Sequence, residues 1–134
     1  MARARAGLPT ERPYLRVANV HRLNEVKTIH LTAAKVKRTR FEPGDLLFVE
    51  RHGNPPEVGR VALWDCSVAD CTHQNHLIRA RPNRDMLLPA YACALLNSAG
   101  GRQLLLRAGK TTSGLPTIST QNVMDALVTL PSIE

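Results

Sequence analysis

Aromatic residues are scarce in this chain, with one Trp, two Tyr and two Phe among 134 residues, so aliphatic side chains must build its core. Cysteines are equally few. Their odd number (Cys66, Cys71 and Cys93), in a sequence without a secretory signal, favours free thiols in a reducing compartment. No hydrophobic run approaches the length of a membrane span. We therefore expect a cytoplasmic protein with no membrane partner, and its length fits one globular domain.

Acidic residues are also in deficit, with 11 Asp and Glu against 18 Lys and Arg, for a formal net charge of +7. The excess is uneven along the chain. Residues 1 to 40 hold ten basic and two acidic residues, and residues 71 to 124 hold six basic and one acidic residue. Residues 41 to 70, between them, hold two basic and six acidic residues. Folding that joins the two basic segments on one face would favour a polyanionic partner. A basic surface that is merely solvated is the alternative.

The hydrophobic pattern predicts short strands interrupted late by short helices. Strands are expected at residues 14–20, 26–31, 46–50, 58–64, 74–80 and 128–130. Helices are expected at residues 32–38, 88–96, 101–108 and 121–127. A turn at Pro43-Gly44-Asp45 and a loop at residues 51–56 separate the middle elements. This order indicates an α+β fold, with short helices on a twisted, mixed β-sheet.

The most informative local feature is a polar loop that leads into a helix start. Gly114 and Pro116 favour an irregular backbone, and Ser119 or Thr120 is a natural N-cap for the helix that follows. Lys110 precedes the loop, whose hydroxyls are Thr112, Ser113, Thr117, Ser119 and Thr120. Hydroxyls and a lysine at a helix start favour anions, so phosphate is a candidate ligand. An ordinary capped turn is the alternative.

This loop resembles the segment that closes the target recognition domain of type I restriction enzyme specificity subunits. Further matches to that family occur in the same order along the chain, which is more specific than any single one. They are Pro13–Val20, Phe41–Phe48 (the turn and strand F-E-P-G-D-L-L-F), Val58-Gly59-Arg60, Gln74–Pro82, and Leu96-Asn97-Ser98 with Gly101-Arg102. The resemblance implies a non-catalytic subunit that recognises double-stranded DNA for a methyltransferase (modification) partner and possibly a restriction subunit. It implies no cofactor in the chain itself.

Within this resemblance we assign two kinds of DNA contact. Phosphate contacts are expected from Lys110, Thr112, Ser113 and Arg60. Base contacts are expected from Arg51, His52 and Asn54, whose donors and acceptors suit guanine and adenine edges.

The expected organisation is a basic tail at residues 1 to 12, a recognition domain at 13 to 131, and the start of a missing spacer helix at 132 to 134. Whole specificity subunits carry two recognition domains joined by long helices, whereas one is recognised here. A fragment, a half-subunit and a truncated product are all open interpretations. A general basic DNA- or RNA-binding module of another complex is the alternative function.

An enzyme is a third interpretation, because Asn54-Pro55-Pro56-Glu57 resembles the N-P-P-aromatic motif of DNA adenine methyltransferases. Glu57, however, offers no ring to stack on a flipped base. No glycine-rich loop or doubly wound domain is present to hold a cofactor. A degenerate methyltransferase fragment therefore ranks last, and we infer no catalytic residue.

Two clusters of polar residues are also set aside as sites. The spacing of Cys66, Cys71, His73 and His76 is not that of a closed zinc site, so no metal is expected. Asp45 and Glu50 could suggest a nuclease centre with His52. Their odd spacing would place them on opposite faces of a strand, and a turn-capping role for Asp45 is simpler.

Overall fold

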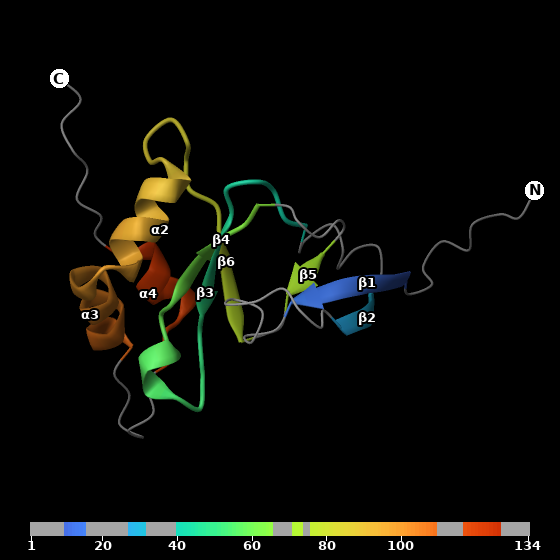
Figure 1. Cartoon of the computed structure of the whole chain (residues 1–134), viewed down its shortest axis with the longest axis horizontal. Helices are drawn as coiled ribbons and strands as arrows, with labels where there is room; N and C mark the ends of the chain where they lie inside the picture. Colours follow the sequence, from blue (N-terminus) through green and yellow to red (C-terminus); the bar gives the residue numbers. More distant parts are fainter. Residues whose placement is uncertain are drawn as a thin grey trace, which may run out of the picture.

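The computed structural model describes residues 10–15, 27–31, 40–65, 71–73, 76–109 and 117–126 (Figure 1). Their elements, in chain order, are β1 (Thr10–Leu15), β2 (Lys27–Leu31), β3 (Leu46–Val49), the 3-10 helix η2 (Pro55–Glu57), β4 (Val61–Leu63), β5 (Thr72–His73), β6 (Leu77–Ala80), α2 (Pro89–Asn97), α3 (Ala99–Ala108) and α4 (Thr120–Met124). No helix among these residues is long and apolar enough to cross a membrane.

The described strands form two three-stranded sheets. In the first, with order β2-β1-β5, β1 runs antiparallel to β2 and parallel to β5. In the second, with order β4-β3-β6, both pairs are antiparallel. The helices lie on one side of this second sheet (Figure 1). The predicted α+β class is confirmed, with the strands shared between a mixed sheet and an antiparallel one.

The core lies on both faces of β3, because its four residues are all buried and alternate between two clusters. Leu46 and Phe48 belong to the cluster that faces the helices, and its other buried members are Val58, Val61, Ile78, Ala92, Leu96, Leu105 and Ile118. Leu47 and Val49 face the opposite way and pack with Trp64, Cys71 and Leu77. β3 is therefore the central strand that supports both layers.

Helices α2 and α3 meet at a single residue, Ser98, which is the C-cap of one and the N-cap of the other. The prediction that residues 97–100 separate the two helices is therefore wrong, because α2 extends to Asn97 and α3 begins at Ala99. Gly101 allows the close approach, because a Cβ there would lie 2.2 Å from the carbonyl oxygen of Leu95. In α3 only Leu105 is fully buried. Leu104, its neighbour, is 37% exposed.

Several boundaries differ from the sequence-based prediction. β1 begins at Thr10, so residues 10 to 12, expected in the basic tail, belong to a strand. β4 begins at Val61 rather than at residue 58, because Gly59 adopts a φ of +80° and turns the chain first. The expected elements at 32–38 and 128–130 lie outside the described residues.

Two predicted local structures are confirmed. The turn at Pro43-Gly44 is present, and Gly44 has a φ of +89°. Helix α4 has Ser119 as its N-cap: the Ser119 Oγ accepts from the Asn122 N–H at 3.1 Å, and the Asn122 Oδ1 accepts from the Ser119 N–H at 2.9 Å. This reciprocal pair is a capping box, with Asn122 in the usual place of Glu or Gln.

Candidate nucleic-acid interface

Two segments that the sequence analysis singled out meet at Glu50, the residue after β3. The Glu50 N–H donates to the His76 carbonyl oxygen at 2.9 Å, which continues the pairing of β3 with β6. The Glu50 carbonyl oxygen accepts from the Ile118 N–H at 3.1 Å. The backbone therefore places the start of the loop at residues 51 to 54 beside Ile118, near the end of the hydroxyl-rich segment at residues 112–120 (the hydroxyl loop).

The chain leaves α3 at Gly109 and returns beside it at Thr117, whose N–H donates to the Gly109 carbonyl oxygen at 3.2 Å. The contact is tight: a Cβ on Gly109 would lie 2.7 Å from the Thr117 carbonyl oxygen and 2.9 Å from the Ile118 Cγ2. The predicted phosphate contacts in between, Lys110, Thr112 and Ser113, lie outside the described residues.

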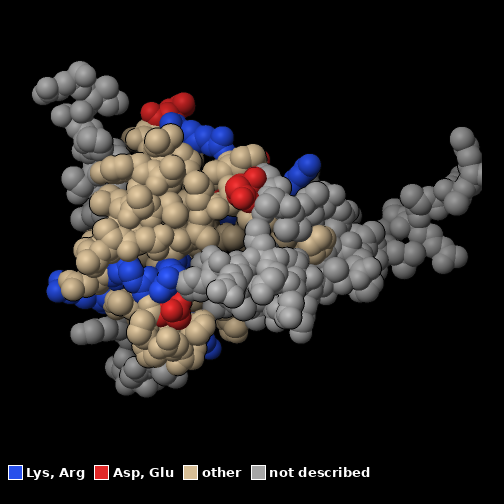
Figure 2. Space-filling view, viewed as in Figure 1, with Lys and Arg blue, Asp and Glu red and all other residues tan. Residues whose placement is uncertain are grey.

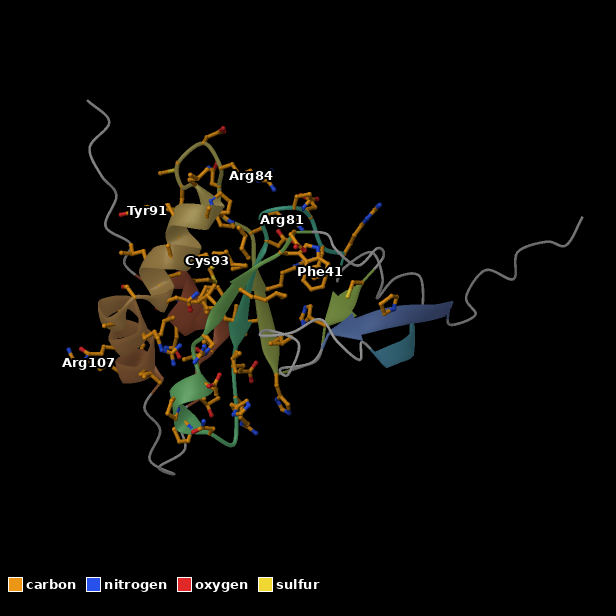
Figure 3. The ribbon with its side chains drawn as sticks, in the orientation of Figure 1. Phe41, Arg81, Arg84, Tyr91, Cys93 and Arg107 are labelled. Carbon is orange, nitrogen blue, oxygen red and sulfur yellow. The ribbon has the colours of Figure 1, made fainter. Side chains whose placement is uncertain are left out.

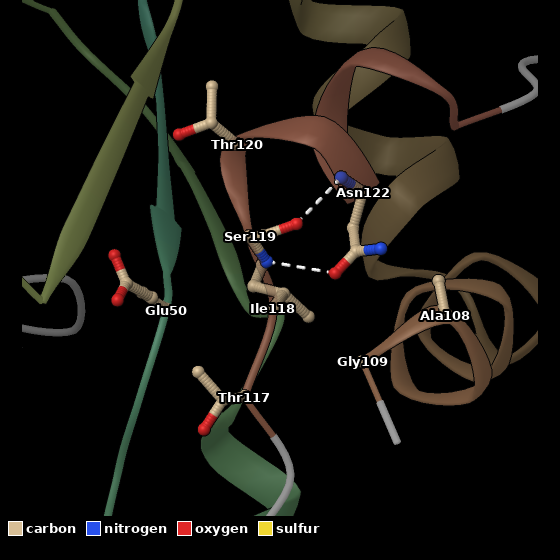
Figure 4. A pocket seen from close by; sticks show the side chains of 8 residues that line it. All are labelled: Glu50, Ala108, Gly109, Thr117, Ile118, Ser119, Thr120 and Asn122. Atoms are coloured by element: carbon tan, nitrogen blue, oxygen red, sulfur yellow. Dashed lines mark hydrogen bonds between the residues drawn. The ribbon is translucent and has the colours of Figure 1, made fainter. Parts of the chain in front are cut away.

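A pocket of about 480 Å³ opens where these segments meet. It is lined by Glu50, Ala108, Gly109, Thr117, Ile118, Ser119, Thr120 and Asn122 (Figure 4). Ser119 Oγ and Asn122 Oδ1 are occupied by the capping box. The Thr117 and Thr120 hydroxyls and the Asn122 Nδ2 remain as polar groups around the Glu50 carboxylate. The pocket thus presents hydroxyl and amide groups beside the Glu50 carboxylate, which can only accept hydrogen bonds.

The loop at residues 51 to 54 presents the three predicted base contacts. Arg51 and Asn54 are exposed, and His52 is half-buried. The His52 Nδ1 accepts a hydrogen bond from the Asn54 N–H at 2.9 Å, so the neutral ring carries its proton on Nε2 and offers a donor there. Asn54 precedes η2 without using its side chain as a cap. Its amide is therefore available to a ligand.

Arg60, the fourth described residue of the predicted site, already has a carboxylate partner. Its Nε lies 3.0 Å from the Glu57 Oε2, and its side chain is 39% exposed. Any phosphate contact from Arg60 would share the guanidinium with Glu57.

Arg102 has a supporting position that the sequence analysis did not assign. Its guanidinium donates to the carbonyl oxygens of Pro56 and, at 3.4 Å, Val58, and so ties α3 to η2. Burial and the nearby positive charge of Arg60 lower the pKa of Arg102, and Glu57 opposes this shift. No sequence signal links these residues, because they are more than 40 positions apart.

Lys and Arg side chains form a few separate groups on the face shown in Figure 2, and the group at the lower left lies beside a carboxylate. Arg107 projects outward from α3 and is exposed (Figure 3). The described residues on η2, its flanking loops and α3 supply Arg51, Arg60, Arg102 and Arg107 against Glu50 and Glu57. This region therefore has a net positive charge that suits a polyanion.

Asp45, at the other end of β3, has the turn-capping role that the sequence analysis preferred. It is fully buried, and its Oδ2 accepts from the Glu42 N–H at 2.8 Å. Arg81 donates to both carboxylate oxygens, at 2.7 and 2.9 Å. Burial would raise the pKa of Asp45, but the hydrogen bonds from Arg81 and Glu42 and the charges of Arg81 and Arg79 together hold it below its usual value. Asp45 is thus committed to a structural ion pair.

The Cys/His cluster is only partly described, since Cys66 lies outside the described residues. Cys71 is buried and His76 is exposed. Within the described ranges, no three His, Cys, Asp or Glu side chains are grouped so as to hold a metal ion. The prediction that the chain binds no metal stays a prediction.

Comparison with known proteins identifies relatives of one kind. No protein-family model matches the chain. The chain is 30% identical, over 131 residues, to the type I restriction enzyme EcoKI specificity subunit of Escherichia coli K12, and the match covers 91% of this chain. It spans only 27% of that relative's length. Its fold matches a crystal structure of an HsdS subunit from Thermoanaerobacter tengcongensis, with a TM-score of 0.61 and 16% identity, over 93% of this chain and 35% of that one.

Proposed function

Because the chain is homologous to one segment of a type I restriction enzyme specificity subunit, we propose that it is a DNA target recognition domain. In this role it binds double-stranded DNA in a sequence-dependent way and directs a methyltransferase (modification) subunit, and with it a restriction subunit, to the target. The chain itself is non-catalytic in this proposal and acts in the cytoplasm, where its DNA substrate lies.

The observation that carries the proposal is the homology over 91% of the chain. The geometry supports it locally, since the Glu50–Ile118 hydrogen bond brings the loop at residues 51 to 54 next to the end of the hydroxyl loop. Recognition of duplex DNA needs both kinds of group that these segments offer: cations for phosphates, and directional donors and acceptors for base edges.

We assign the DNA contacts accordingly. Arg51, His52 and Asn54 read base edges. Arg60, Lys110, Thr112 and Ser113 contact phosphates. In this arrangement the phosphate contacts fix the position of the domain on the duplex, and the residues of the 51 to 54 loop carry the sequence information.

Equilibrium binding to a duplex, with single-stranded DNA and double-stranded RNA as competitors, tests the proposal. We expect duplex DNA to compete best and log Kd to rise linearly with log salt, because phosphate contacts release counterions. Equal competition by all three nucleic acids would instead support the general basic nucleic-acid-binding module. Methyl transfer by the purified chain with S-adenosylmethionine would support the methyltransferase fragment.

A further inference from the structure

Glu50 differs from Glu42, Asp45 and Glu57, because no described Lys or Arg forms an ion pair with it. Glu57 pairs with Arg60 at 3.0 Å. Glu42 and Asp45 both pair with Arg81, at 3.3 and 2.7 Å. Within the described part of the chain the Glu50 side chain has no such ion pair, although it is half-buried and lines the polar pocket. Among the described residues, its carboxylate is thus an acceptor with no ion-pair partner in an otherwise basic region.

The backbone holds Glu50 in place on a rigid element. The Glu50 N–H donates a hydrogen bond to the His76 carbonyl oxygen, and the Glu50 carbonyl oxygen accepts one from the Ile118 N–H. The residue before β6 and the segment before α4 therefore fix the Glu50 backbone from both sides. Figure 4 shows the side chain at the end of β3, across from the segment that carries Thr117 and Thr120. These bonds fix the backbone from which the Glu50 side chain extends to line the pocket.

The hydroxyls at the start of α4 suit an anion, but the Glu50 carboxylate in the same pocket disfavours a phosphate and favours a hydrogen-bond donor. An ionised carboxylate accepts hydrogen bonds only, and it repels a DNA phosphate. In the major groove of DNA, the exocyclic amino groups of adenine (N6) and cytosine (N4) are the donors. The Thr117 and Thr120 hydroxyls and the Asn122 Nδ2 can meet a neighbouring acceptor, such as the N7 of adenine.

We propose that Glu50 is a specificity-determining residue that accepts a hydrogen bond from the exocyclic amino group of one adenine or cytosine in the target. This inference rests on the proposed function, and it adds a residue that the sequence analysis had considered only as part of a nuclease centre. Glu50 adjoins the base-reading loop and extends it into the pocket. Its negative charge also weakens binding to sequences that offer no donor at this position.

Binding-site selection on random duplexes tests the inference with the 134-residue wild-type chain and the variants Glu50→Gln and Glu50→Ala. We expect one position of the wild-type site to require adenine or cytosine. Glu50→Ala should relax that position because Ala has no acceptor, whereas Glu50→Gln pairs a neutral carbonyl acceptor with an amide donor and should shift the position toward adenine, whose N6 and N7 it can contact. Both substitutions should also tighten binding to non-specific duplexes by removing a negative charge. Asp85→Asn is the control, because it removes the same charge from an exposed loop before α2.

Base analogues separate the amino group from other features of the base. Purine lacks the N6 amino group of adenine, and pyrimidin-2-one lacks the N4 amino group of cytosine. Placed at the Glu50-dependent position, the analogue should weaken wild-type binding roughly 5- to 150-fold. It should change the binding of Glu50→Ala little, and this difference between the two proteins isolates the contact.

The outcomes distinguish the inference from the proposed function. A wild-type chain with no sequence preference overturns both. Clear wild-type preference that is unchanged in Glu50→Gln, Glu50→Ala and the analogue duplexes overturns the role of Glu50 and leaves the proposed function standing. Loss of preference in Asp85→Asn as well would show that net charge, rather than the Glu50 carboxylate, sets the specificity, and would also overturn the role of Glu50.

Discussion

The backbone N–H of Ile118 donates to the carbonyl oxygen of Glu50 at 3.1 Å, across 68 positions of the chain. This hydrogen bond attaches the segment before α4 to the end of the central strand β3. Ile118 is fully buried in the core cluster that lies between β3 and the helices. The candidate interface is thus assembled on the core itself, and changes that loosen this junction should affect stability and DNA binding together.

Gly109→Ala should loosen the junction. The added Cβ would lie 2.7 Å from the Thr117 carbonyl oxygen, so the backbone must shift. We expect a loss of about 1–3 kcal/mol in the free energy of unfolding, measured by urea denaturation, with weaker duplex binding. Gly100→Ala is the matched control: nothing lies within 4 Å of its Cβ position, and alanine should favour α3 by up to about 1 kcal/mol. Equal effects of the two substitutions would contradict the tight contact at Gly109.

Asn97→Ala should detach α2 from the edge strand β4. The Asn97 side-chain amide makes two hydrogen bonds to the Val61 backbone: Oδ1 accepts from its N–H at 3.0 Å, and Nδ2 donates to its carbonyl oxygen at 2.7 Å. We expect a loss of about 1–3 kcal/mol, because buried groups of Val61 lose their partner. Asn97→Asp should not restore stability, since its second carboxylate oxygen faces that carbonyl oxygen. Full thermal stability of Asn97→Asp would argue against the two-sided contact.

The Asp45–Arg81 pair predicts how stability depends on pH. The pKa of Asp45 is lower in the folded protein than the ordinary pKa of an aspartate side chain. The pair therefore contributes stability above about pH 4, and this contribution is lost as the pH falls through the folded pKa. Arg81→Gln should leave the buried carboxylate without its cation. We expect a cost of about 3 kcal/mol at pH 7, near the lower limit for a broken buried pair because Arg81 is partly exposed.

In Arg81→Gln this pH dependence should weaken, because burial raises the pKa of Asp45 and only the Glu42 N–H and the charge of Arg79 still oppose that shift. The free energy of unfolding, measured between pH 7 and pH 2, should show a smaller loss on acidification than in the wild type. Arg107→Gln, at an exposed position on α3, is the control and should leave the wild-type profile unchanged. Parallel profiles for the wild type and Arg81→Gln would contradict the assigned role of the pair.

Lys110→Ala and Asn54→Ala should affect DNA binding in different ways. Loss of a phosphate contact at Lys110 should weaken binding to all duplexes alike and reduce the salt slope by about one contact. Loss of the Asn54 amide should relax one base position, at a cost of roughly 1–3 kcal/mol of discrimination. Base preferences compared across the two variants check the assignment. A changed preference in Lys110→Ala, with none in Asn54→Ala, would show that the two roles are reversed.

The local structure of this chain follows from short sequence patterns. Pro43-Gly44-Asp45 predicted the turn, and Ser119 predicted the start of α4, because a turn and a helix cap depend on residues within four positions of each other. The hydrophobic pattern also predicted most elements. It did not predict the single-residue join at Ser98, since that depends on the absence of a Cβ at Gly101 against the carbonyl oxygen of Leu95.

The long-range contacts of the candidate site could not be predicted in the same way. The anchoring of η2 by Arg102 and the bond between Ile118 and Glu50 join residues that carry no common motif. Glu50 was considered only as half of a nuclease pair with Asp45. The structure places the two carboxylates at opposite ends of β3, with Asp45 paired and Glu50 open to the pocket. The property that distinguishes Glu50, the lack of an ion pair with any described Lys or Arg, is visible only in three dimensions.

Selection of binding sites from random duplexes by the wild-type chain at near-physiological salt tests the central claim most directly. Sequence-specific recognition predicts a short enriched motif, bound at least about tenfold more tightly than a scrambled duplex of the same composition. Equal binding of selected and scrambled duplexes, with a steep dependence on salt alone, would reduce the interaction to non-specific attraction by phosphates. That result would contradict a role as a target recognition domain.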